Sequence, residues 1–361
     1  AFCPTTCGSA CCTATERCHV ASSTCVRDNG ACSTADDCGD DTYCDGGICV
    51  PFGVPPTRTS DDTCTRSIDI DSIAPDVQCR WTAPPAGDPF PDHYQVMSTP
   101  VVVDFDLDGD ATTLEPSIVF TTFPTVGSYG QPGVIRVIDG ATCAHQFTLS
   151  GPSEMSMSPA GPALGDLDGD GRAEIVGAAH GGGLLAWRYD ATAGTFGLLW
   201  RSAACSGSTR TPDTTGGADR WSGPSIHDLD DDGVPEILYG AVVYDAAGCM
   251  TTTSLGFPAY HRGVVPVVAD VDEDGEVELI EGNGVYAWTG TDWALESYFT
   301  GAGVSLGLVA VADLGTFPIA ALGGADFAEI VVVAAGAVRV ETIEGTVVVG
   351  ADTKPGGGRG G

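Results

Sequence analysis

The sequence is poor in positive charge. Its 361 residues contain 15 lysines and arginines, with a single lysine among them, against 49 aspartates and glutamates, so the formal net charge is −34. Binding of nucleic-acid phosphates needs clustered lysine and arginine. The composition therefore argues against a nucleic-acid partner.

Long apolar runs are also missing. No segment approaches the roughly 20 apolar residues of a membrane-spanning helix, so we expect no membrane span. The chain begins Ala1-Phe2-Cys3, without a methionine or an apolar leader. Such a start is expected of a mature product after removal of a signal peptide.

Sequence motifs of common enzymes are absent as well. There is no Gly-x-Ser-x-Gly elbow, no zincin helix and no phosphate-binding loop, and the six histidines are widely spread. Five tryptophans after Trp81 are candidates for stacking on sugars, but core packing is their more common role. We therefore expect no enzymatic activity.

Cysteine, in contrast, is concentrated at the N-terminus. Ten of the 15 cysteines lie between residues 3 and 49, in a segment with little apolar content. Dense cysteine of this kind predicts a disulfide framework and an oxidising, secreted or extracellular location. The expected disulfide-bonded residues are Cys3, Cys7, Cys11, Cys12, Cys18, Cys25, Cys32, Cys38, Cys44 and Cys49.

The cysteines divide into two modules, followed by a linker. Residues 1–26 carry six cysteines with an adjacent third and fourth, and residues 27–50 carry four around a glycine-rich turn. Residues 51–63 form a proline- and threonine-rich linker in which O-glycosylation is possible at Thr57, Thr59 and Ser60. Spacing alone leaves 15 connectivities open for the first module. The modules either bind a partner or act as a protease-resistant spacer.

An acidic motif organises the rest of the chain. Four segments read Pro-x-x-x-Asp-x-Asp-x-Asp-Gly, and three of them have a Glu at the ninth position counted from the first aspartate. Carboxylates at alternate positions converge if the backbone turns tightly, and oxygen-only ligands suit calcium better than magnesium. A single copy would be consistent with a solvated turn, whereas four copies with matching flanks favour metal sites.

We expect three or four calcium ions on these loops. The candidate ligands are Asp104, Asp106, Asp108, Asp110 and Glu115 in the first loop; Asp166, Asp168, Asp170 and Glu174 in the second; Asp228, Asp230, Asp232 and Glu236 in the third; and Asp270, Asp272, Asp274 and Glu278 in the fourth. The first loop departs from the others because Thr112 stands at its ninth position. A fifth copy at Asp313 lacks the second and third aspartates, so no metal is expected there.

The segments between the loops have the periodicity of strands. They are runs of four to seven β-branched and aromatic residues bounded by glycine and aspartate, such as 133–140, 183–190, 240–245 and 284–290. Repeats of about 40 to 60 residues holding roughly four short strands are typical of propeller blades. We therefore predict an all-β fold in which residues 64–361 form a β-propeller of four-stranded blades, either complete or incomplete.

Two resemblances add to these expectations. Residues 98–350 resemble the FG-GAP or VCBS-type repeats related to the integrin alpha-subunit propeller. This resemblance implies calcium ligands at the first, third, fifth and ninth loop positions and a backbone carbonyl at the seventh. The seventh residue is Arg172 in the second loop, Val234 in the third and Glu276 in the fourth.

Residues 1–26 resemble knottin-type mini-domains, which implies the pairs Cys3–Cys12, Cys7–Cys18 and Cys11–Cys25. Crossed pairing is expected in the second module.

These features favour a secreted, calcium-stabilised module for binding or adhesion, with an extracellular protein or a glycan as its ligand. The alternatives are a structural subunit of an extracellular filament or surface assembly, and a propeller hydrolase.

Only five blade-like units are present. The ring is closed by candidate strands at 67–70 and 77–81, or the chain is a fragment, or a neighbouring subunit fills the gap through self-association.

Overall fold

The computed structural model divides the chain into two compact units, residues 1–76 and 77–361, which are described separately. The described residues are 5–7, 10–12, 16–19, 24–27, 30–33, 42–45, 47–51, 76–110, 113–124, 130–151, 154–214, 222–230, 232–252, 267–301, 307–334 and 336–353. Among them, no helix has the length and apolar character that crossing a membrane requires.

The first unit contains three short antiparallel hairpins. They pair β1 (Thr5–Cys7) with β2 (Ala10–Cys12), β3 (Glu16–His19) with β4 (Thr24–Arg27), and β5 (Thr42–Asp45) with β6 (Ile48–Pro51). Such small hairpins have too little apolar surface to be stable alone. The disulfides supply the missing stabilisation.

The disulfides of the first module differ in part from the knottin-like pairing. The bond Cys7–Cys18 is present as expected, but Cys12 pairs with Cys25. The expected pairs Cys3–Cys12 and Cys11–Cys25 are therefore wrong. The reason is strand alternation, because neighbouring residues of β2 face opposite sides: Cys12 is buried toward β4 and Cys11 is exposed. The partners of Cys32, Cys38, Cys44 and Cys49 lie outside the described contacts.

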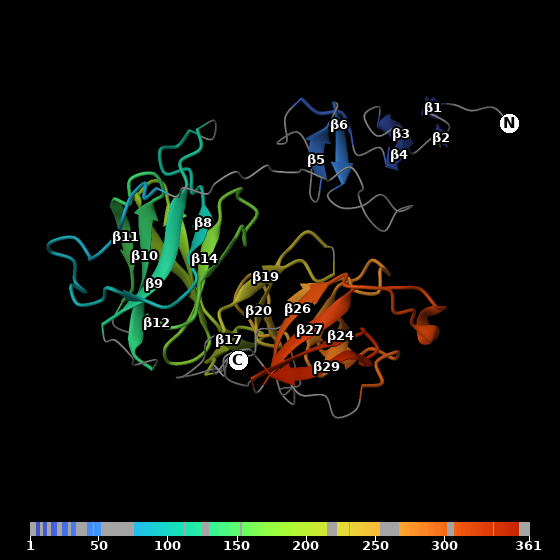
Figure 1. The fold of residues 1–361 in the computed structure, drawn as a ribbon. Coiled ribbons are helices and arrows are strands. Elements are labelled where there is room, and N and C mark those ends of the chain that lie inside the picture. Colours follow the sequence, from blue (N-terminus) through green and yellow to red (C-terminus); the bar gives the residue numbers. More distant parts are fainter. Residues whose placement is uncertain are drawn as a thin grey trace. The chain divides into compact units, whose positions relative to one another are not determined.

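The second unit consists of five antiparallel sheets that follow one another along the chain (Figure 1). The first sheet contains β8 (Val101–Val103), β9 (Ser117–Phe123), β10 (Pro132–Asp139) and β11 (His145–Leu149), with β7 (Gln95–Val96) and β12 (Ser156–Met157) attached. The second contains β13 (Ala163–Gly165), β14 (Glu174–Ala178), β15 (Leu184–Asp190) and β16 (Thr195–Arg201).

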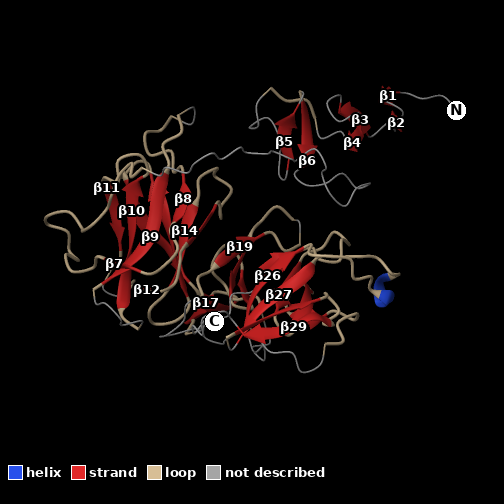
Figure 2. Ribbon diagram, viewed as in Figure 1, coloured by secondary structure: helices blue, strands red, loops and turns tan. Residues whose placement is uncertain are grey.

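The third sheet contains β19 (Ser225–His227), β20 (Glu236–Tyr239) and β21 (Val242–Tyr244). The fourth contains β22 (Val267–Ala269), β23 (Glu278–Glu281), β24 (Gly284–Trp288) and β25 (Trp293–Leu295), and the fifth β26 (Leu308–Ala312), β27 (Glu329–Ala334), β28 (Ala337–Glu341) and β29 (Val347–Thr353). A hairpin of β17 (Ala203–Ser206) and β18 (Thr209–Pro212) precedes the third sheet. The short 3-10 turn η3 (Ala320–Leu322) is the one helical element among the described residues (Figure 2).

The sheets pack face to face in chain order. In β14, Ile175 contacts a core shared with the first sheet, whereas Val176 contacts a core shared with the third. The same alternation in β20 and β23 joins the third sheet to the fourth and the fourth to the fifth. Because both faces of these strands are covered, they are near-continuous apolar runs. Each fully buried side chain of this size contributes roughly 1.5–3 kcal/mol.

The expectation of an all-β fold is confirmed, but a closed propeller is not observed. Among the described residues, no core cluster joins the fifth sheet to the first. The strand expected at 77–81 is wrong, because this segment is held by side chains: Cys79 is bonded to Cys143, and Trp81 packs edge-on against Phe120. The other expected strand, 67–70, lies outside the described residues.

Candidate metal centres

The acidic loops connect the first and second strands of successive sheets. Strand pairing places the ninth-position glutamate opposite the residue that precedes the first aspartate. This register is Gly165 with Glu174, His227 with Glu236, and Ala269 with Glu278. The ladder therefore closes each of these loops at the same length and brings the glutamate beside the start of the loop.

The first aspartate of each loop organises the backbone. Asp166 Oδ1 accepts hydrogen bonds from the N–H groups of Gly169 (2.8 Å) and Asp170 (3.2 Å), and Oδ2 accepts one from Gly171 (2.8 Å). Gly171 has a φ of 84°, which only glycine adopts at little cost. Asp228 and Asp270 make the corresponding contacts in the third and fourth loops.

Three loops bring three carboxylates together. Within each group, one oxygen from each residue lies within 4.8 Å of the others. The groups are Asp166, Asp168 and Glu174; Asp228, Asp230 and Glu236; and Asp270, Asp272 and Glu278. We refer to them as the second, third and fourth triads, after their sheets. They correspond to the first, third and ninth positions of the motif.

The glutamate of each triad is held in place by the loop backbone. Oε2 of Glu174 accepts a hydrogen bond from Leu167 N at 2.8 Å, and Glu278 does the same from Val271 N at 2.9 Å. Burial, aided by the neighbouring aspartates and opposed by the hydrogen bond from the N–H group, raises the pKa of Glu174 to about 7 and that of Glu278 to about 8. The pKa of Glu236 is raised for the same reasons.

The triads have the composition of a hard-cation site. Oε1 of Glu174 and Oδ1 of Asp272 are buried and have no hydrogen-bond partner among the described residues. A buried carboxylate oxygen without a donor is costly, and a cation would relieve both that cost and the repulsion between the carboxylates. All-oxygen donors on a flexible loop suit calcium.

The remaining loop positions lie outside the triads. The fifth-position aspartates use Oδ1 to accept a hydrogen bond from the N–H two residues on: Arg172 for Asp170, Val234 for Asp232 and Glu276 for Asp274. These contacts orient the seventh residue of each loop. Ligation by the fifth-position carboxylates and by the seventh-position carbonyls stays a prediction.

The first loop has a different arrangement. The register pairs Val103 with Ser117, so serine occupies the position of the triad glutamate, whereas Glu115 is exposed and donates its N–H to Asp104 Oδ2 at 2.9 Å. Arg172, from the second loop, contacts Asp106 Oδ2 at 2.6 Å. The described residues of this loop form no group of three carboxylates.

The other acidic residues of the first loop are also engaged. Thr113 Oγ1 donates to Asp108 Oδ2 at 2.8 Å, and Asp110 N donates to Asp108 Oδ1 at 2.9 Å. A guanidinium and a hydroxyl thus contact carboxylates that calcium was expected to bind. The sequence signal for this difference is the threonine at the ninth position.

The fifth sheet retains the contact between a loop N–H group and a buried glutamate. Glu329 Oε2 accepts a hydrogen bond from Leu314 N at 2.8 Å, as the triad glutamates do, and its Oε1 is buried without a partner among the described residues. Asp326 instead accepts a hydrogen bond from Phe317 N at 2.6 Å. The glutamate contact therefore also fixes the loop where the aspartates are missing.

Two features near the second triad were not predicted from the sequence. Arg188, on β15, forms an ion pair with Asp168 at 2.5 Å. A disulfide joins Cys205 to Cys249 and ties the β17–β18 hairpin to the end of the third sheet. The ion pair and the disulfide each join residues far apart in the sequence, and no local motif predicts either of them.

Comparison with known proteins supports the repeat and the fold. Residues 166–239, which span the second and third triads, match the FG-GAP-like repeat family. No curated protein sequence matches the chain. The crystal structure of the V. cholerae biofilm matrix protein Bap1 is similar to it, with a TM-score of 0.52 and 21% identity over 75% of this chain and 41% of Bap1.

Two lyase structures are more distant. The exotype rhamnogalacturonan lyase YesX gives a TM-score of 0.45 at 16% identity, over 71% of this chain and 46% of the lyase. The Bacillus licheniformis rhamnogalacturonan lyase PL11 gives 0.41 at 19%, over 72% and 47%. The chain spans less than half the length of each of these three proteins. At these identities the likeness concerns the fold alone.

Proposed function

We propose that the chain is an extracellular binding module of the adhesion type, built as a calcium-stabilised β-propeller of four-stranded blades. The observation that carries the proposal is the recurrence of one carboxylate triad at the same place on three consecutive sheets. The FG-GAP-like match and the fold likeness to a biofilm matrix protein support it. Disulfides in both units fit an oxidising, extracellular location.

Three calcium ions are assigned, one to each triad. When bound, calcium neutralises carboxylates that otherwise repel one another, and it stabilises the folded chain by mass action. The protein's own residues position the metal: the ladder fixes the glutamate, and the first aspartate fixes the turn. The module's role is to bind an extracellular protein or glycan rather than to catalyse a reaction.

Calcium binding and ligand binding test the proposal together. Isothermal titration should give three calcium ions per chain, and excess chelator should lower the melting temperature. Beads coated with the calcium-loaded chain should then capture ligands from an array of glycans and extracellular matrix proteins. A chain that binds no calcium, or a loaded chain that captures nothing, would refute the proposal.

A second candidate function is a subunit of an extracellular assembly. It is favoured by the fifth sheet, because no core cluster of the described residues joins this sheet to the first. Its outer strand β29 exposes Val347 and Val349. An apolar edge strand recruits other strands. Light scattering of the calcium-loaded chain over a range of concentrations decides this: growing particles support the assembly, and a constant monomer excludes it.

A further inference from the structure

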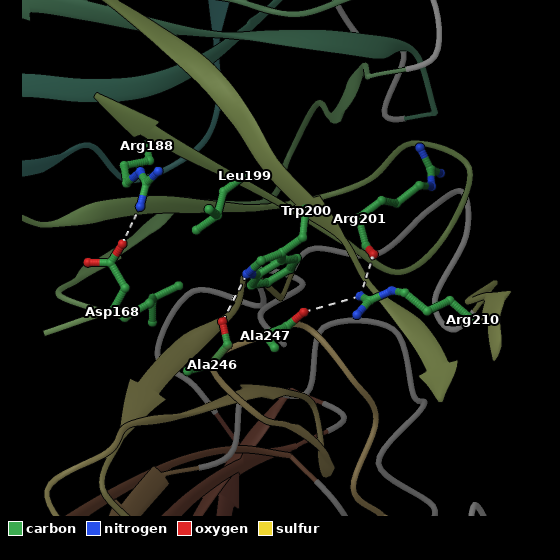
Figure 3. Close-up of a pocket in the computed structure, with 9 residues that line it drawn as sticks. Asp168, Arg188, Leu199, Trp200, Arg201, Arg210, Ala246 and Ala247 are labelled. Carbon is green, nitrogen blue, oxygen red and sulfur yellow. Dashed lines mark hydrogen bonds and ion pairs between the residues drawn. The ribbon is translucent and has the colours of Figure 1, made fainter. Parts of the chain in front are cut away.

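A groove of about 700 Å³ lies between the second and third sheets, beside the second triad (Figure 3). Its walls come from the acidic loop between β13 and β14, from β15, β16 and β18, and from the turn after β21. The lining residues that matter for binding are Asp168, Arg188, Trp200, Arg201, Arg210 and Ala247. Residues from five separate segments thus converge on one groove.

The groove is unusual in its charge. In a chain with 49 acidic and 15 basic residues, Arg188 and Arg210 place two guanidinium groups on either side of the Trp200 indole (Figure 3). The third arginine, Arg201, presents its carbonyl oxygen here, while its guanidinium donates to Gly182 O at 3.4 Å. Of these two guanidinium groups, that of Arg188 is paired with Asp168 at 2.5 Å, so the charge of Arg210 is the one left for a ligand.

Arg210 is held by neutral groups alone. Its Nη2 donates to the carbonyl oxygens of Arg201 (3.2 Å) and Ala247 (3.1 Å), and its Nη1 lies 3.3 Å from Cys249 Sγ. Among the described residues, no carboxylate forms an ion pair with it. Such contacts fix the guanidinium without neutralising it, so its charge remains available to an anionic ligand.

The wall that carries Arg210 is itself fixed. The Cys205–Cys249 disulfide joins the β17–β18 hairpin to the third sheet, and Ala203 exchanges backbone hydrogen bonds of 2.9 Å with Gly248 and Met250. Preorganisation of this kind reduces the entropy lost when a ligand binds. The groove is thus already shaped before it is filled.

Trp200 provides a rigid aromatic wall. Its Nε1 donates to Ala246 O at 2.9 Å, and Gly248 packs so closely on the ring that a Cβ there would lie 2.5 Å from Trp200 Cε3. An indole gives a sugar ring an apolar surface. The nearby carbonyl oxygens of Arg201, Ala246 and Ala247 each keep a lone pair that accepts a hydroxyl hydrogen.

This set of groups matches one ligand chemistry. A carboxylate binds guanidinium groups, hydroxyls donate to carbonyl oxygens, and a sugar ring lies against an indole. An acidic peptide offers the first group but few hydroxyls. We propose that the groove binds a carboxylate-bearing sugar of an acidic polysaccharide. The inference rests on the proposed binding function and names its ligand class.

The test uses the full chain in saturating calcium with four probes. Polygalacturonate is the acidic polysaccharide with carboxylates, dextran the neutral one, dextran sulfate the sulfated one without carboxylates, and polyglutamate the acidic peptide. By biolayer interferometry, we expect polygalacturonate to bind more tightly than dextran, dextran sulfate and polyglutamate, and its affinity to fall as sodium chloride is added.

Arg210→Gln is the diagnostic variant, because the side chain is exposed and makes no ion pair among the described residues. Loss of a charge-assisted hydrogen bond should weaken polygalacturonate binding at least tenfold. Arg80→Gln removes an exposed arginine that does not line the groove, so it should leave the affinity unchanged.

The inference is overturned if Arg210→Gln binds as well as the unaltered chain, or if dextran, dextran sulfate or polyglutamate binds as tightly as polygalacturonate. Failure of polygalacturonate alone, with three calcium ions bound and another ligand captured, refutes the groove assignment but not the proposed function. Failure of calcium binding refutes the proposed function itself.

Discussion

The buried carboxylate of Glu281 allows a stability prediction with a worked magnitude. Glu281 ends β23 and is fully buried, and neither carboxylate oxygen has a hydrogen-bond partner among the described residues. Burial raises its pKa from the usual 4.5 to about 7. The folded protein therefore keeps a proton on Glu281 that the unfolded chain loses at lower pH.

The sign and size of the effect follow from proton linkage. Because the folded pKa is the higher one, the stabilisation from protonated Glu281 is complete below pH 4.5 and declines as pH rises to about 7. The difference between those two values corresponds to about 3 kcal/mol. Next to Glu281 in the chain, the carbonyl oxygen of Gly282 accepts a hydrogen bond from Arg339, which is paired with Glu341. The pKa of Tyr286 is raised by burial and by Glu281.

The perturbation is Glu281→Gln, which keeps the shape and removes the titration. Relative to the unaltered chain, the free energy of unfolding of the variant should increase by about 3 kcal/mol between pH 4.5 and pH 8. Urea unfolding in saturating calcium at several pH values measures this difference. Glu115→Gln, at an exposed glutamate, controls for the loss of one formal charge. A difference that stays constant with pH would show that the reasoning about Glu281 is wrong.

Three further predictions concern the triads and the groove. Asp230→Asn should reduce the calcium stoichiometry from three to two by titration calorimetry, whereas Asp108→Asn in the first loop should leave it unchanged. Calcium should strengthen binding of polygalacturonate, because the ion engages Asp168 and thereby frees the guanidinium of Arg188, and equal affinities in calcium and in chelator would contradict this. Replacing Cys205 and Cys249 by alanine should destabilise the chain by about 4 kcal/mol, since the disulfide closes a loop with a sequence separation of 44. Chemical unfolding measures that loss, and polygalacturonate affinity should fall with it.

Local sequence patterns predicted most features of the three triads. An aspartate at the first position, a glycine that permits the turn and a glutamate at the ninth position are read directly from the residues around Asp166. Strand alternation then fixes the side of the sheet to which each side chain points. The loop positions and the side-chain directions depend on neighbours within about ten residues, so they can be predicted from the sequence.

The unpredicted features all depend on long-range contacts. The ion pair of Arg172 with Asp106 joins residues 66 apart, and the contacts of Arg210 with the turn after β21 span almost 40. The first loop was expected to differ because of the threonine at its ninth position, but the placement of Ser117 at the position of the triad glutamate follows from strand register. No periodicity in the chain encodes which arginine meets which carboxylate.

The packing of the sheets in chain order has a consequence for cooperativity. Among the described residues, an interior sheet such as the third is stabilised through two interfaces and a terminal sheet through one, so the free energy approximates a sum over nearest neighbours. Unfolding should then begin at the ends of the array and spread inward. An ion bound at the third triad, on Asp228, would strengthen the middle of the array and oppose that spread from either side. Addition or loss of one sheet during evolution would change the length of the array without altering the contacts of sheets elsewhere in it.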